Sequence, residues 1–527
     1  MKKTLAIIGA GSSGLIMLKS ALEKLPDWEV TCFEGGDSIR GCWGSLGEDF
    51  LSTSTKYTTQ FSCFREFEAD LDPSGKQGEF FRGREYGDYL ERFADAFDLR
   101  GSIQLNARVA RVERGAGGWQ VTFEDGVVRQ FSHVAICTGL VQQAEALKSE
   151  LPILQARCEW EKVQGKTVVV MGGGEAAAEV ANQLARPEKR NQVYLSLRSG
   201  IRVSPRYHPI KGVPSDFLRN RLMLSIRRSW RNRIGQKFVE SRIRFRSVFE
   251  QVFPSSNRPR AKGSQLGRDW DSRLAAEAKD GLFNMFHNKS DGFLQAVGEE
   301  RVKIVGPPVD ESGKTFREFA SEKECRVEAD LMVPSIGFQS GLKRLFGGTI
   351  EVSQFYRGCL HRDYKDLFLI GFARPVLGNI PSISEQQALY VVAHLAGELA
   401  RGESWQEQYQ EEREFLARTY PCVNLEKVYP VEMFSYCDQL ARERGMLPSI
   451  RAVSSLAQWL RIQLSPATTL HYLDYEQRTE QVYTPLALNG LLGVIRFADL
   501  VSQNLPRIVG KERGGGMDTT PVSEPSR

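Results

Sequence analysis

The chain has 527 residues, of which 41% are hydrophobic and 26% are charged, and its formal net charge is +5 at neutral pH. This length predicts two or three domains with cores of their own, and the small positive charge does not by itself indicate nucleic-acid binding. Nine cysteines and six histidines are dispersed along the chain without a Cys-x-x-Cys pair, which argues against a metal site, a redox-active dithiol and a disulfide framework. No apolar run approaches the roughly 18 residues that a membrane-spanning helix requires. We therefore expect a cytoplasmic protein with reduced thiols.

The N-terminal segment predicts a turn that binds a dinucleotide. The apolar run Thr4–Ile8 is typical of a buried parallel strand, and Gly9-x-Gly11-x-x-Gly14 follows it before an apolar helical pattern. The first glycine allows a tight turn, the second lets the backbone approach a pyrophosphate, and the third lets the helix pack on the strand. Glu34 ends the next strand twenty residues beyond Gly14, where a carboxylate can bind ribose hydroxyls.

A second segment repeats this pattern. The apolar strand Lys166–Met171 leads into Gly172-x-Gly174-x-x-Ala177 and another helical pattern. Alanine is acceptable at the third position because that position only controls packing distance. The residue twenty positions further on is not acidic, and Arg198 follows it directly. A guanidinium without a competing carboxylate favours the 2′-phosphate of NADPH over NADH.

These segments predict an α/β protein with two Rossmann-like domains, a helical insertion and a C-terminal helical extension. Short apolar strands that end at a glycine recur at 133–139, 331–337 and 366–376, the first two after segments that alternate like a β-meander. Two nucleotide sites in one chain suggest a tightly held FAD and an NADPH that reduces it. The expected boundaries are an FAD-binding domain of residues 1–165 and 331–400, an NADPH-binding domain of 166–330 with a basic helical insert at about 206–265, an extension of 401–510 and a disordered tail of 511–527.

The insert is strongly basic. Residues 202–262 contain sixteen lysines and arginines against three acids, Asp216, Glu240 and Glu250, and the apolar residues between the arginines suggest amphipathic helices. A solvated surface insertion, the wall of a substrate tunnel, guidance of an anionic ligand and contact with anionic lipid headgroups all fit this composition. Nucleic-acid binding is not expected because no binding module accompanies the charge. The apolar segment 483–510 is interrupted by polar residues, which favours a packed or interfacial helix.

Several segments, in this order, resemble the flavin-containing monooxygenases, the single-component class that includes the dimethylaniline-type oxygenases. They are FEGGDSIRGCWG at 33–44, LSTSTKYTTQFS at 51–62, VYLSLRSGIRVSPR at 193–206, LFLIGFARPVLGNIPSISEQQAL at 367–389 and VYPVEMFSYCDQLARERGMLPSI at 428–450. The resemblance extends over nearly the whole chain to about residue 500.

The resemblance implies that NADPH reduces FAD, that O₂ adds at flavin C4a, and that the resulting peroxyflavin oxygenates nitrogen, sulfur or aromatic carbon of a small organic substrate. It also implies a homodimer. Ser54 and Thr55 are the candidate catalytic residues, in the wall between flavin and nicotinamide that Trp43 completes. The residues expected to bind the cofactors are Gly9, Gly11, Ser12, Ser13, Gly14, Glu34, Cys42, Trp43, Thr138, Gly139, Gly172, Gly174, Glu175, Ala177, Arg198, Gly371 and Gln387. No metal site is expected.

The chain departs from the family pattern at two places. The family's Phe-x-Gly-x-x-x-His signature is missing at 151–157, which reads LPILQAR, and Ser54 stands where the family usually has an asparagine. These departures favour a specialised biosynthetic reaction, such as decarboxylative hydroxylation or halogenation of an aromatic acid, as the alternative to amine or sulfide oxygenation. An NADPH oxidase that releases H₂O₂ and a degenerate flavoprotein that acts as a binding partner also stay open. A disulfide reductase is disfavoured because Cys32 and Cys42 are ten residues apart.

Overall fold

The structure is a computed structural model that describes most of the chain. It covers residues 2–473 apart from 49, 69–78, 141–142, 156, 205, 208–213, 245–263, 279–287, 291, 400–404 and 448–455. The expected tail of 511–527 and the apolar segment 483–510 lie outside the described residues.

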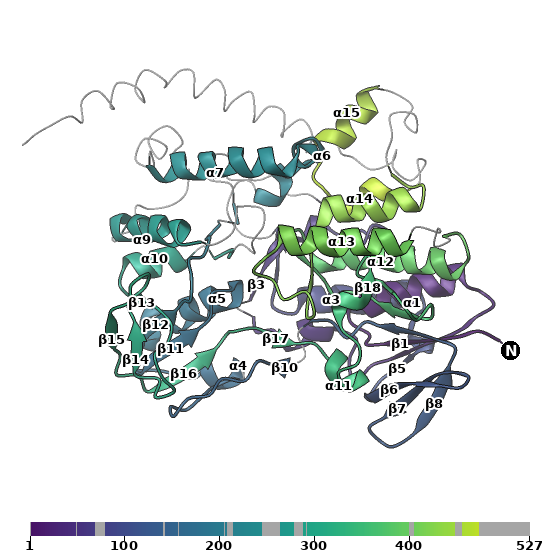
Figure 1. The fold of residues 1–527 in the computed structure, drawn as a ribbon, viewed down its shortest axis with the longest axis horizontal. Helices are drawn as coiled ribbons and strands as arrows, with labels where there is room; N and C mark the ends of the chain where they lie inside the picture. The colour runs from purple at the N-terminus through teal and green to yellow at the C-terminus, as the bar shows by residue number, and fades with distance from the viewer. Residues whose placement is uncertain are drawn as a thin grey trace, which may run out of the picture.

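The first of the two main sheets has seven strands, in the order β18-β19-β20-β9-β1-β2-β5, and combines N-terminal strands with strands from residues 355–369 (Figure 1). Five of its strands are parallel, and β18 and β19 form an antiparallel edge. The strands are β1 (Thr4–Ile8), β2 (Glu29–Phe33), β5 (Ile103–Gln104), β9 (His133–Ile136), β18 (Phe355–Tyr356), β19 (Leu360–His361) and β20 (Leu367–Leu369). Leu5 to Ile8 are buried between two parallel neighbours, which confirms the prediction from the apolar run. Helices α1 (Ser12–Lys24) and α12 (Ile380–Leu395) pack side by side, and α3 (Glu85–Ala96) contacts α1.

A second, four-stranded parallel sheet has the order β13-β12-β11-β16. It contains β11 (Thr167–Met171), β12 (Gln192–Ser196), β13 (Val302–Val305) and β16 (Leu331–Pro334). Helix α5 (Glu175–Leu184) follows β11, and α10 (Phe293–Gly298) lies against α5 and α9 (Ser264–Ala276). Because β16 pairs with β11, residues 331–334 belong to this second sheet, so the expected return to the FAD-binding domain at residue 331 was wrong. A short apolar strand ending at a glycine suits either sheet, and its sequence does not tell which neighbour it pairs with.

Short hairpins and ribbons connect or decorate the two sheets. The predicted meander before residue 133 is confirmed as β6-β7-β8, and the region before residue 331 forms the hairpin β14-β15. These elements are β3 (Leu51–Thr55), β4 (Phe80–Arg82), β6 (Val109–Gly115), β7 (Gly118–Phe123), β8 (Val128–Phe131), β10 (Gln143–Ala144), β14 (Thr315–Arg317), β15 (Glu324–Arg326) and β17 (Phe338–Gln339), with the short helices α2 (Lys56–Thr59), α4 (Arg157–Trp160) and α11 (Leu342–Phe346).

The C-terminal extension packs on the part of the molecule that contains the seven-stranded sheet. Leu416, Tyr429 and Leu440 are buried in the same hydrophobic core as β1 and α1, and β22 pairs in parallel with β21. The extension contains α13 (Trp405–Thr419), β22 (Tyr429–Glu432), α14 (Met433–Glu443) and α15 (Leu456–Leu464), whereas β21 (Ala373–Leu377) precedes it. The extension therefore shares one hydrophobic core with the first sheet and its helices.

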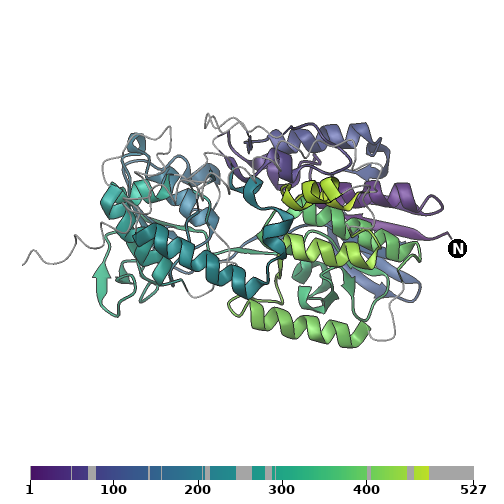
Figure 2. The same cartoon turned by 90° about the horizontal axis from the view of Figure 1, so that it is seen from above.

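The basic insert contributes α6 (Arg221–Ser225) and α7 (Arg228–Arg244), and α7 extends from above the second sheet toward the C-terminal helices (Figures 1 and 2). Of the interpretations left open for the insert, a fully solvated charged face is contradicted at its central arginine, since Arg231 is 6% exposed and pairs with Glu432, which is 4% exposed. Trp230 and Ile234 are instead each 57% exposed. The arginine turns inward because the extension offers a buried carboxylate, which a buried guanidinium requires. Within the described residues, no helix has both the length and the apolar character that crossing a bilayer demands.

Candidate active site

The first glycine turn has the backbone that a bound dinucleotide requires. Gly9 has φ +99°, and a Cβ there would lie 2.9 Å from the Cys137 carbonyl oxygen. A Cβ on Gly14 would lie 1.8 Å from the Gly9 carbonyl oxygen, so only glycine lets α1 begin this close to β1. Gly11 is the N-cap of α1 and provides no capping side chain. The first N–H groups of the helix thus suit a pyrophosphate.

Glu34 ties the end of β2 to this turn. Its carboxylate accepts a hydrogen bond from the Ala10 N–H at 2.8 Å and another from the Gly36 N–H at 2.9 Å. The carboxylate therefore shapes the turn in addition to its predicted contact with ribose. Carboxylate oxygens have further acceptor capacity, so the two roles are compatible.

The other residues predicted to hold FAD lie at the same edge of the first sheet. Ser12 opens α1, and Thr138 and Gly139 follow β9. Cys42 and Trp43 lie in a 3₁₀ turn, Gly41–Ser45, that faces Gly11, since a Cβ on Gly41 would lie 3.1 Å from the Gly11 Cα. The Trp43 ring packs against Tyr86 with 4.8 Å between ring centroids.

Ser13, Gly371 and Gln387 come together where α1, β20 and α12 meet. The hydroxyl of Ser13 is 2.8 Å from that of Ser384, and a Cβ on Gly371 would lie 2.2 Å from the Ser13 Oγ. The Gln387 Oε1 accepts the Gly371 N–H at 2.9 Å. These residues fix the packing of the two helices, and their contact with FAD stays a prediction.

The second turn has the same form as the first. Gly172 has φ +132°, a Cβ there would lie 2.3 Å from the Ser335 carbonyl oxygen, and Ala177 is buried against the sheet. Gly174 is the N-cap of α5, and a Cβ on it would meet open space. Arg198 is exposed two residues beyond Ser196, which accepts the Gly172 N–H at 3.1 Å. The open space and the nearby guanidinium fit NADPH, and these contacts stay predictions.

The two candidate catalytic residues on β3 have different surroundings. Thr55 is buried, and its hydroxyl caps α2 by accepting the Thr58 N–H at 3.3 Å. Ser54 is partly exposed and lines a pocket. The geometry therefore favours Ser54 over Thr55 for contact with a ligand.

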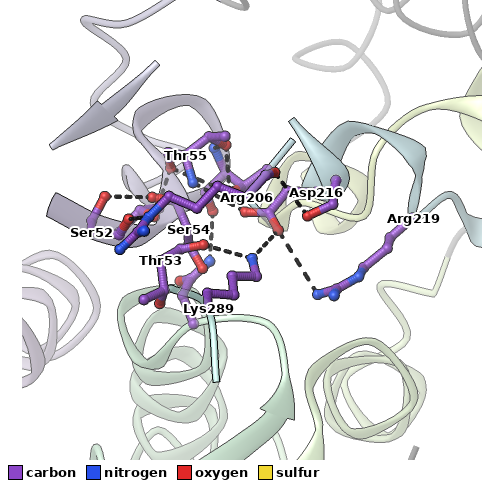
Figure 3. A network of polar contacts seen from close by, with 12 residues as sticks. Ser52, Thr53, Ser54, Thr55, Arg206, Asp216, Arg219 and Lys289 are labelled. Carbon is purple, nitrogen blue, oxygen red and sulfur yellow. Dashed lines mark hydrogen bonds and ion pairs between the residues drawn. The ribbon is translucent and has the colours of Figure 1, made fainter. Parts of the chain in front are cut away.

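Buried charges that were not predicted from the sequence hold β3 in place (Figure 3). Lys289 donates to the Thr53 carbonyl oxygen at 2.6 Å and pairs with Asp216 at 2.8 Å. Asp216 also accepts the Thr55 N–H at 3.1 Å, and Arg206 donates to the carbonyl oxygen of Ser52 at 3.0 Å. Residues of the NADPH half and the insert thus fix a strand of the FAD half.

Burial and charge act in opposite directions on this cluster. Burial alone would raise the pKa of Asp216, but Lys289, Arg219 and hydrogen bonds together lower this pKa below its usual value. Burial lowers the pKa of Lys289, against the effect of Asp216. Glu175 at the start of α5 accepts the Lys289 N–H at 3.1 Å, and burial raises the pKa of its carboxyl. Asp216 is one of three acids in a basic stretch, and this was the available sequence signal.

A pocket opens between β3, the start of α12 and the C-terminal extension. The lining residues are Ser54, Thr58, Asp216, Arg219, Leu224, Leu377, Gly378, Asn379, Glu432, Met433, Phe434 and Ala467. Asn379 caps α12 and also donates to the Thr58 carbonyl oxygen at 3.0 Å, which joins two walls of the pocket. Its lining combines apolar side chains with a few polar groups, as ligand sites do.

Several known proteins are similar to this chain in sequence. Residues 2–262 match the family described as flavin-binding monooxygenase-like. The chain is 25% identical over 484 residues to 4-hydroxybenzoate brominase (decarboxylating) of Pseudoalteromonas luteoviolacea, covering 85% of each chain. It is 31% identical over 225 residues to dimethylaniline monooxygenase [N-oxide-forming] 4 of Homo sapiens, covering 38% of this chain and 39% of that protein.

Solved structures share the fold. The closed crystal structure of cyclohexanone monooxygenase superposes with a TM-score of 0.57 at 16% identity, covering 84% of this chain and 97% of that chain. S-allyl-L-cysteine S-oxygenase from Allium sativum gives a TM-score of 0.53 at 16% identity, covering 84% and 89%. With two nucleotide-binding turns and the family match over residues 2–262, this chain belongs to the flavin-binding monooxygenase-like family and is an NADPH-dependent flavoprotein monooxygenase that uses FAD.

Proposed function

We propose that this monooxygenase oxidises an aromatic acid held in the pocket beside Ser54. Two relatives that match 85% of this chain and of their own length are 4-hydroxybenzoate brominases (decarboxylating). The N-oxide-forming relatives match 38–39% of this chain. The observation that carries the proposal is the pocket itself, because it combines aromatic and apolar walls with charged side chains next to the strand of the candidate catalytic serine.

The residues of the pocket suit an aromatic ring. Leu224, Leu377, Met433 and Phe434 offer apolar surface, and Phe434 can pack against the ring of a ligand. The Ser54 hydroxyl offers one hydrogen-bond donor, fewer than the amide of the family's asparagine. When bound, FAD takes a hydride from NADPH and activates O₂. The chain excludes water and orients the ring, which suppresses unproductive loss of oxidant.

The experiment compares products from purified holoenzyme with NADPH and O₂. 4-Hydroxybenzoate and dimethylaniline are offered in parallel, each with and without bromide, and products are identified by mass spectrometry. We expect a product from the phenolic acid with loss of its carboxyl group. A hydroxylated product without bromide indicates decarboxylative hydroxylation, and a brominated product with bromide indicates decarboxylative halogenation. Oxygenation of the amine together with an unchanged phenolic acid would refute the proposal.

A second measurement separates oxygenation from oxidase activity. NADPH-reduced enzyme is mixed rapidly with O₂, and flavin absorbance is followed. A monooxygenase shows a delayed reoxidation, whereas an oxidase reoxidises at once and releases H₂O₂ in proportion to the NADPH consumed. Stoichiometric H₂O₂ in the presence of the phenolic acid would contradict the proposed function.

A further inference from the structure

The lining of the pocket beside Ser54 holds two carboxylates and one guanidinium, and the cations that pair with those carboxylates bring the group to four cations against two carboxylates. Asp216 is paired with Lys289 and Arg219. Glu432, the other carboxylate in the lining, is paired with Arg231 and Arg228. Since the low polarity of a partly closed site strengthens charge interactions, this imbalance favours an anionic ligand.

Arg219 is the cation of this group that lines the pocket. Its Nη1 lies 3.8 Å from the Asp216 Oδ1, beyond hydrogen-bond distance, while that same oxygen accepts from Lys289 at 2.8 Å. Its side chain is 22% exposed, compared with 6% for Arg231, whose Nη2 donates to Glu432 at 2.6 Å. In the described part of the chain, Arg219 is therefore held electrostatically, with its guanidinium donors available to a ligand.

The backbone of Arg219 is fixed from two sides. Its N–H donates to the Asp216 carbonyl oxygen at 3.3 Å, and its own carbonyl oxygen accepts the Ala467 N–H at 2.8 Å. Figure 3 shows the side chain reaching Asp216 from the side opposite the β3 residues. The insert and the C-terminal extension thus present one guanidinium to the pocket, with Asp216 as a positioning residue.

We infer that Arg219 binds the carboxylate of the substrate and determines the preference of the pocket for aromatic acids. A guanidinium offers two parallel donors to a carboxylate, and the apolar walls accept the ring. Ser54 lines the same pocket, so a carboxylate bound at Arg219 directs the ring toward β3. This inference rests on the proposed function, because it assumes that the pocket is the site of substrate oxidation.

Binding to the oxidised holoenzyme tests the inference without turnover. The probes are 4-hydroxybenzoate, its uncharged analogue 4-hydroxybenzamide, and 4-methylphenol, measured by calorimetry. We expect R219M to raise the Kd of 4-hydroxybenzoate by about 10- to 100-fold and to change the Kd of the two uncharged probes by about twofold or less. R219K should give an intermediate value because it keeps the charge and loses the fork of donors.

Arg227 provides the matched control, since it is an exposed arginine of the same insert that does not line the pocket. R227M should bind all three probes as the wild type does, and flavin content and thermal midpoint check the folding of each variant. If R219M loses flavin, the test uses the wild type and R219K instead. The inference then requires that the wild type binds 4-hydroxybenzoate more tightly than 4-hydroxybenzamide, and that R219K reduces this preference. Absence of this preference, or equal weakening of charged and uncharged probes, overturns the inference.

The outcome separates the inference from the proposed function. If 4-hydroxybenzoate binds through Arg219 but gives no product, the inference stands and the proposed reaction fails. If 4-hydroxybenzoate is converted and R219M does not discriminate against it, the reaction stands and the role of Arg219 is wrong.

Discussion

The two nucleotide-binding halves share a backbone plan and differ in the charges that follow their second strands. Gly9 donates to the Phe33 carbonyl oxygen at 2.7 Å, and Gly172 donates to that of Ser196 at 3.1 Å. After the second strand, the first half has Glu34, bonded back to its own turn, whereas the second half has an exposed Arg198. Both turns share the same backbone packing, and the charged side chain after the second strand differs between them, so we expect this side chain to select which dinucleotide binds.

The largest expected effect comes from filling the space between turn and helix in the FAD half. In G14A the new Cβ would meet the Gly9 carbonyl oxygen at 1.8 Å, so the helix must move away from the strand. We expect the purified variant to retain roughly a tenth of the wild-type flavin or less, with a clearly lower thermal midpoint. The ratio of flavin to protein absorbance measures the first quantity, and a melting curve measures the second.

Gly174 offers the matched change in the NADPH half. A Cβ there meets open space, so G174A should keep its flavin and its thermal midpoint and raise the KM for NADPH, because the methyl group occupies room meant for the pyrophosphate. A fully yellow and stable G14A protein would show that the packing argument is wrong.

The second prediction concerns the contact between the two halves, which the variant K289M breaks. K289M removes the partner of buried Asp216 and the donor to the Thr53 carbonyl oxygen. Leaving a buried charge uncompensated should lower the free energy of unfolding by about 3–5 kcal/mol, as measured by urea denaturation. The double variant D216N/K289M should recover part of this loss because the buried carboxylate is then neutral, and Arg219, which loses its partner, is 22% exposed. An unchanged unfolding free energy in K289M contradicts the bridging role.

The third prediction tests which charge selects the nucleotide. R198A should raise the KM for NADPH by about 10- to 100-fold, the effect of losing a charge-assisted contact to phosphate, and leave the KM for NADH within about twofold. Steady-state oxidation of both nucleotides measures this. The control is E34Q in the other half, which should weaken FAD retention and spare the ratio of the two KM values. An equal change for both nucleotides in R198A assigns the phosphate contact to another residue.

The sequence predicts the structure correctly where local geometry decides it. Gly9 and Gly172 were identifiable because a turn with positive φ next to a carbonyl oxygen excludes other residues. The family resemblance likewise predicted the cofactors, because the motifs of the family occur in order along the chain.

Contacts between distant segments were not predictable. Arg231 and Glu432 are 201 residues apart in the chain, and Lys289 and Asp216 are 73 apart. From the sequence alone, each of these side chains is expected to be an ordinary surface charge. Each becomes part of a buried ion pair only because the fold brings its partner close. The assignment of β16 to the wrong sheet has the same origin, since strand pairing is a long-range property.

The smallest expected effect concerns a position that differs between the two sheets. His133 pairs in register with Leu5, and Leu331 occupies the matching place beside Val168. Burial lowers the pKa of His133 to about 4. Because the unfolded chain takes up this proton near pH 6.5, the folded protein loses stability as the pH falls from 6.5 toward 4. H133L should remove this loss, on the order of 1 kcal/mol at pH 5 after allowance for partial exposure. Melting curves at pH 7 and pH 5 measure it, and an equal drop for variant and wild type would assign the acid sensitivity to other groups.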